Sequence, residues 1–167
     1  MSNNNRISKT RILGITSIVA IFAMSFASAS FATTPKVAYF ININVSCANT
    51  SFCGGPKYTE TVSATAYVGG HQTTQITMEQ WNANGHVAAT IYTTWTGTWK
   101  IGSDGNFITS GLNTTTIVVG SHAMTTRAHF SNYDTGTSAT PGTLTCAQLL
   151  GAPCPKGVSA SQTVVKV

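Results

Sequence analysis

The stretch VAYFININVS (residues 37–46) alternates apolar and polar side chains along its length. One side of the alternation carries Val37, Tyr39, Ile41, Ile43 and Val45, and the other carries Ala38, Phe40, Asn42, Asn44 and Ser46. A period of two is typical of a β-strand, because successive side chains point to opposite faces of a sheet. The stretch therefore predicts a strand with one strongly buried face.

The same period continues through residues 59–68 and 73–99, where glycine and asparagine residues mark the turns. If residues 84–85 (Asn-Gly) form a two-residue hairpin loop, Met78 lies opposite Ile91 and the apolar faces of the two strands coincide. This agreement of faces favours an antiparallel hairpin at this point.

The preceding turn contains two adjacent glycines and a histidine. A three-residue loop at residues 69–71 (Gly-Gly-His) sets Val62 opposite Met78 and Ala64 opposite Ile76, again with the apolar faces together. Residues 59–99 are therefore predicted to form a three-stranded antiparallel meander.

Further strands follow in the second half of the chain. A type II′ turn at residues 120–121 (Gly-Ser) places Ile117 opposite Met124. Residues 107–111 either extend the first strand of this hairpin or form a strand of their own, residues 162–167 read as a closing strand, and only residues 145–150 favour a helical turn. The pattern predicts a small all-β antiparallel domain over residues 33–167, with a β-sandwich as first choice and a partly closed barrel as the alternative.

Four cysteines lie in two close pairs, Cys47 with Cys53 and Cys146 with Cys154. Of the three possible pairings, the two local disulfides are preferred, and disulfides indicate an oxidising compartment. Neither spacing matches the half-sites of a zinc module and no histidine is near in sequence, so we expect neither a metal nor a cofactor.

The N-terminus has the order of a cleavable secretory signal. Basic residues (Arg6, Lys9 and Arg11) precede an apolar run over residues 12–26 and then small residues up to Ala32. We expect cleavage of residues 1–32 and export to the periplasm, cell surface or medium. No permanent membrane anchor is expected, because the apolar run is shorter than the roughly 20 residues of a spanning helix.

The charge of the chain argues against nucleic acid as a partner. The full chain carries nine basic and four acidic residues, for a net charge of +5, but three of the basic residues lie in the signal. The six that remain are scattered rather than clustered, which does not fit a nucleic-acid interface.

The outward face of the meander is rich in threonine and almost free of charge. A solvated sheet explains such a face without any function. The alternative is a binding face for a glycan or a cell-surface protein, with Trp81, Tyr92 and Tyr67 stacking on a sugar and Glu79 binding its hydroxyls. Two other tryptophans, Trp95 and Trp99, fall on the inward face and are interpreted as core residues.

Two other classes of function stay open. Amphipathic threonine-rich strands also occur in membrane-inserting or pore-forming β proteins. A secreted hydrolase would need convergent acid and base groups, but His71 and His86 lie about ten strand positions apart, and His122 and His129 point to opposite faces of one strand. No catalytic residues are therefore assigned, and a secreted binding module is the preferred interpretation.

Overall fold

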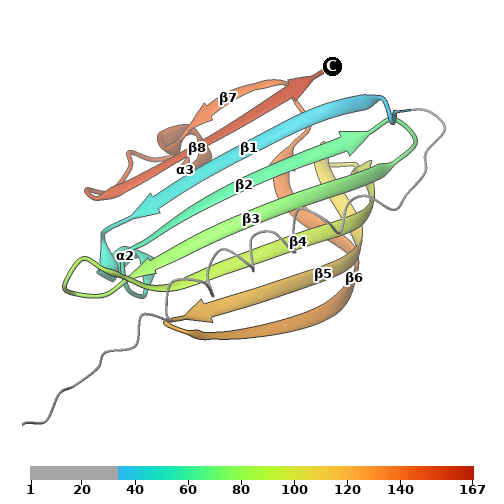
Figure 1. Ribbon diagram of the computed structural model, residues 1–167. Coiled ribbons are helices and arrows are strands. Elements are labelled where there is room, and N and C mark those ends of the chain that lie inside the picture. The colour runs from blue at the N-terminus through green and yellow to red at the C-terminus, as the bar shows by residue number, and fades with distance from the viewer. Residues whose placement is uncertain (1–33) are drawn as a thin grey trace, which may run out of the picture. The chain divides into compact units, whose positions relative to one another are not determined.

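Eight antiparallel strands form one continuous sheet in the computed structural model, which describes residues 34–167 (Figure 1). In chain order the elements are β1 (Val37–Cys47), α2 (Thr50–Cys53), β2 (Tyr58–Tyr67), β3 (His71–Trp81), β4 (Val87–Ile101), β5 (Asn106–Val119), β6 (His122–Ser138), β7 (Gly142–Thr145), α3 (Cys146–Leu150) and β8 (Val158–Lys166). The strands are ordered β6-β5-β4-β3-β2-β1-β8-β7 across the sheet. The predicted signal sequence and its predicted cleavage site lie outside the described residues.

The sheet is open between β6 and β7, but its two edges approach each other at one end. β6 ends at Ser138 and β7 begins at Gly142, although the two strands lie at opposite edges of the sheet. This short connection spans at most about 14 Å. The prediction of a small antiparallel all-β fold is confirmed, and the strands form one open, curled sheet rather than two separate sheets.

Core contacts show how far the sheet curls. The ring centroids of Tyr39 on β1 and Phe107 on β5 are 5.2 Å apart, although three strands lie between β1 and β5 in the sheet order. In a flat sheet these strands would be about 19 Å apart, because neighbouring strands are spaced by about 4.8 Å. The end of β5 that carries Phe107 therefore folds over the inward face of β1.

A pair of glycines lies at a close approach of β4 and β5. Gly97 on β4 lies opposite Gly111 on β5. A Cβ atom on Gly97 would lie 2.0 Å from the carbonyl oxygen of Ser110, and one on Gly111 would lie 2.1 Å from that of Thr96. Only glycine fits at both positions, and we attribute the tight curl to this approach.

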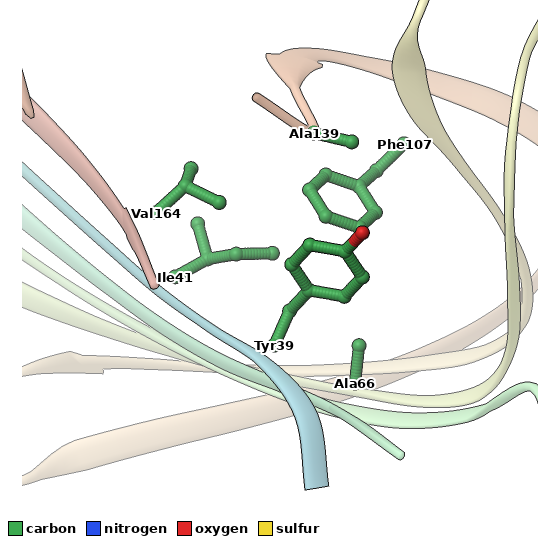
Figure 2. Packing of buried hydrophobic residues seen from close by; sticks show 6 residues of the cluster. All are labelled: Tyr39, Ile41, Ala66, Phe107, Ala139 and Val164. Carbon is green, nitrogen blue, oxygen red and sulfur yellow. The ribbon is translucent and has the colours of Figure 1, made fainter. Parts of the chain in front are cut away.

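The core lies where the folded-over strands meet β1 and β8 (Figure 2). Its buried members are Tyr39, Ile41, Ala66, Phe107, Ala139 and Val164. The rings of Tyr39 and Phe107 meet edge to face at 82°, and Trp99 packs against both. Edge-to-face contacts of this kind add to the stabilisation from apolar burial.

The predicted register is confirmed at two of three turns, because Met78 pairs with Ile91 and Ile117 pairs with Met124. The two-residue loop predicted at residues 84–85 is wrong, since β3 ends at Trp81 and β4 begins at Val87, and a register shift between Gln80 and Trp81 restores the predicted pairing. The first turn is different, because Val62 pairs with Ile76 rather than with Met78. The loop begins one residue earlier, at Val68, and this displaces the register by two residues. A shift of two keeps every side chain on its face, so the alternation alone does not distinguish the two registers.

Both local disulfides, Cys47–Cys53 and Cys146–Cys154, are present and are consistent with an oxidising, extracellular setting. The first joins the end of β1 to α2, a helical turn that the sequence reading did not predict. There the side-chain oxygen of Asn49 accepts a hydrogen bond from the Phe52 amide at 3.1 Å, which caps the turn. Within residues 34–167, no helix has the length and apolar character required to cross a membrane.

Candidate functional site

The inward face of the curled sheet contains a partly enclosed cavity of about 240 Å³. Its apolar wall consists of Ile41, Ile43, Val45, Val62, Ala64, Ala66, Ile76, Trp99 and Phe107. Its polar lining consists of Glu60, Gln72, Thr74, Trp95, Thr109, Tyr133, Thr135 and Thr137. Apolar walls with a few polar groups are the usual lining of a small-molecule site.

Small inward-facing residues leave this space empty. Ala64 and Ala66 on β2 carry only methyl groups, and the Gly97–Gly111 pair carries no side chains at all. The same alternation places larger inward side chains on either side of these small residues. The cavity is therefore explained by the small size of the alanines and by the paired glycines, to which we also attribute the curl of the sheet.

Three buried polar atoms of the cavity lining have no hydrogen-bond partner among the described residues: Gln72 Nε2, Trp95 Nε1 and Thr109 Oγ1. Gln72 is only 5% exposed and Thr109 only 4%. The other end of the Gln72 amide is satisfied, because the Thr74 hydroxyl donates to Gln72 Oε1 at 3.0 Å. Leaving a buried polar group unpaired costs about 1–3 kcal/mol, so three in one cavity indicate a missing partner.

The strand register relates these three side chains to a pair of glycines. Gln72 lies opposite Gly97, which in turn lies opposite Gly111. Trp95 is a diagonal neighbour of Gln72 on the adjacent strand, a separation of about 7–8 Å that long side chains can span. Thr109 lies on the other side of the glycine pair, opposite Trp99 and about 13 Å along the strands from Trp95.

An aromatic cluster flanks this end of the cavity. The ring of Trp95 lies 5.3 Å from that of Phe130 and 5.4 Å from that of Tyr133, measured between centroids. Tyr133 is 50% exposed and also lines the cavity, so it lies between the interior and solvent. This end of the cavity therefore has flat aromatic walls.

Glu60 lies towards the other end of the cavity. It pairs with Val45 and Met78 on the neighbouring strands, and Met78 is six residues from Gln72, about 20 Å along β3. Burial raises the pKa of the Glu60 carboxyl above its usual 4.5. None of the described residues that line the cavity is a lysine or an arginine.

The raised pKa of Glu60 predicts how stability depends on pH. The folded state binds the Glu60 proton more tightly than the unfolded state does. The resulting stabilisation is complete below pH 4.5 and is lost as the pH rises through the raised folded-state pKa. The neutral variant Glu60→Gln does not titrate, so its melting temperature relative to that of the wild type is expected to increase between about pH 4 and pH 7.

Differential scanning calorimetry across this pH range measures the effect. Glu79→Gln, which removes a carboxylate from the outer face, is the matched control for the loss of one negative charge. A difference between Glu60→Gln and wild type that stays constant with pH would contradict the assignment.

The outer-face residues proposed from the sequence are only partly brought together. Glu79 and Tyr92 are diagonal neighbours on β3 and β4, about 7–8 Å apart, and Tyr92 is 46% exposed. Trp81 is half-buried, and the Lys57 ammonium lies 4.7 Å from the centre of its ring. Tyr67 lies at the opposite end of the β2–β3 hairpin, about 33 Å along the strand from Trp81.

Trp95 and Trp99 lie on the inward face, as the alternation predicts, but they also line the cavity. The sequence pattern predicted that both tryptophans are core residues and did not predict that they line a cavity. The signal that could have indicated it is Gly97, which stands between the two tryptophans at an inward position where a third large side chain would otherwise fill the core.

The four histidines are all exposed and lie at or near strand ends or on the edge strand β6. Within residues 34–167, no group of three or more histidine, cysteine, aspartate or glutamate side chains is placed to hold a metal ion. Asp104 is held in a turn, where the Asn106 amide donates to its carboxylate and lowers its pKa. The Asp104 carboxylate therefore stabilises this turn.

The fold and its cavity are those of a curled antiparallel sheet with a partly enclosed interior. Comparisons of the chain with protein-family models, curated proteins and solved structures found no match.

Proposed function

We propose that this protein is an exported binding protein that holds a small, largely apolar molecule in the cavity of its curled sheet. The observation that carries the proposal is the combination of apolar walls with three buried polar atoms that lack partners. In a core that served only for packing, we would expect side chains to fill this space and hydrogen bonds to pair these atoms. An empty cavity and an unpaired buried polar atom each lower the stability of the fold.

The size of the cavity limits the ligand. An apolar cavity of about 150 Å³ in another protein holds benzene. By proportion, a cavity of about 240 Å³ accommodates a molecule of roughly ten non-hydrogen atoms. Larger drug-like molecules usually occupy pockets of at least about 300 Å³.

Filling the cavity is expected to abolish binding. Ala64 faces the cavity from β2, and Ala64→Leu places a larger apolar group into the space. We expect affinity for two small probes, acetophenone and isopropylbenzene, to fall at least about tenfold, because the variant side chain takes the volume that the ligand requires. Ligand-observed NMR with the oxidised protein measures this loss.

Thr61→Leu is the matched control, because Thr61 stands on the same strand but is exposed on the outer face. It should bind both probes as the wild type does. If neither probe binds the wild type, or if both variants bind equally well, the cavity is not a binding site.

A glycan-binding outer face is the second candidate, and the observation that favours it is the exposed ring of Tyr92 beside Glu79. Lys57 lies over the Trp81 ring, which limits stacking of a sugar there. A glycan-array hit that is lost in Tyr92→Ala and retained in Ala64→Leu would assign binding to this face instead.

A further inference from the structure

The three unpartnered atoms define the polar group that they require. An amide nitrogen and an indole nitrogen only donate hydrogen bonds, so Gln72 Nε2 and Trp95 Nε1 both need an acceptor. The Thr109 hydroxyl can donate as well. The matching group on a ligand is therefore an oxygen that accepts two or more hydrogen bonds.

The charge of the cavity argues against an anionic acceptor. No lysine or arginine is among the described lining residues, and Glu60 is the one carboxyl group among them. A carboxylate or phosphate would enter a largely apolar space without a cation to balance it, which is costly. The acceptor is therefore neutral.

The two ends of the cavity differ in shape and chemistry. The unpartnered donors lie at the end that Trp95, Trp99 and Phe107 line with flat rings. Ile43, Val45 and Val62 line the part of the cavity towards Glu60. A molecule with its acceptor among the aromatic residues would extend its apolar part along these aliphatic side chains.

We propose that the ligand is a small neutral carbonyl compound, a ketone or an ester, whose oxygen accepts hydrogen bonds from the diagonal neighbours Gln72 and Trp95. This inference rests on the proposed function and names the class of ligand for the same cavity. A carbonyl oxygen has two lone pairs in the plane of its substituents, which suits donors that converge from neighbouring strands.

Three probes of similar size and shape separate the possibilities. Acetophenone carries a neutral carbonyl, isopropylbenzene carries no acceptor, and benzoate carries an anionic one. Each is titrated into 15N-labelled, oxidised protein, and the indole N–H signal of Trp95 is assigned by its absence in Trp95→Phe. We expect acetophenone to move this signal downfield, because a hydrogen bond to the indole N–H deshields the proton, and benzoate to bind more weakly than acetophenone.

Removing one donor tests the chemistry directly. Gln72→Met keeps the length of the side chain and removes its amide, so affinity for acetophenone should fall about tenfold while that for isopropylbenzene stays within about twofold. Gln75→Met makes the same change at an exposed position on the outer face of β3 and should leave both affinities unchanged.

The outcomes separate this inference from the function on which it rests. If no probe binds the wild type, the proposed function fails. If acetophenone and isopropylbenzene bind but Gln72→Met weakens both equally, the cavity binds apolar molecules and the carbonyl inference is wrong. Tighter binding of benzoate than of acetophenone, or a Trp95 indole signal that acetophenone does not move, would also overturn it.

Discussion

Replacing Gly97 by alanine is expected to lower the free energy of unfolding by about 3 kcal/mol and the melting temperature by about 10 °C. The added Cβ atom would lie 2.0 Å from the carbonyl oxygen of Ser110 on the adjacent strand. That atom belongs to the backbone and cannot rotate away, so β4 and β5 must separate. Chemical denaturation of the oxidised protein, followed by circular dichroism, measures the change.

Gly55→Ala is the control for this variant, because a Cβ atom on Gly55 meets nothing within 4 Å. Gly111→Ala should lose at least as much stability as Gly97→Ala, since its Cβ atom meets the backbone of β4 in the same way and its φ of 156° also disfavours a side chain. An effect below about 1 kcal/mol at both paired glycines would show that the sheet does not depend on their close approach. The curl, and the cavity that it creates, would then need another explanation.

The alternation of side chains was enough to predict which residues face inward. It correctly identified the buried face of β1, and the predicted pairing of Met78 with Ile91 is present although the loop is five residues long rather than two. These features are local, because side-chain direction follows from the pleat and short turns limit the pairing of neighbouring strands. The register error at the first turn arose because two registers that differ by two residues place the same faces together.

Curvature was not predictable in the same way. Period two shows that a strand has two faces, but it does not show how strongly the sheet bends. The contact between Tyr39 and Phe107 joins strands that are four positions apart in the sheet, and nothing in either local sequence indicates it. Gly97 and Gly111 become informative only once β4 and β5 are known to pair in the register that places them opposite each other.

The sequence predicted a binding site on the outer face of the sheet, whereas the candidate cavity lies on the inner face. The difference arises because the sequence does not predict the curvature of the sheet. From sequence, an exposed aromatic on the polar face, such as Tyr92, is the natural candidate for binding, whereas an inward tryptophan indicates packing. A strongly curled sheet changes this interpretation, because its inward face encloses space. Trp95 has an unpartnered indole N–H there, which a fully packed core residue would rarely have.

Replacing Phe107 by alanine is expected to cause the largest loss of stability, about 3–5 kcal/mol. Phe107 is 2% exposed and meets Tyr39 and Trp99 edge to face, so its ring holds the folded-over end of β5 against β1. Because Phe107 also lines the cavity, the variant that remains folded should accept bulkier ketones than the wild type. Thermal unfolding and NMR titration with a ketone larger than acetophenone measure the two effects.

Two further variants make this prediction decisive. Phe107→Leu retains much of the side-chain volume and should remain folded if the alanine variant does not, with a smaller loss of stability and a smaller gain in cavity space. Phe40→Ala removes a phenyl ring from the outer face of β1, where Phe40 is 42% exposed, and should cost little stability.

If the Phe107 and Phe40 variants lose similar stability, the folded-over end of β5 is not held by the core. If stability falls as expected but the preference for ligand size stays the same, Phe107 supports the fold without shaping the binding cavity.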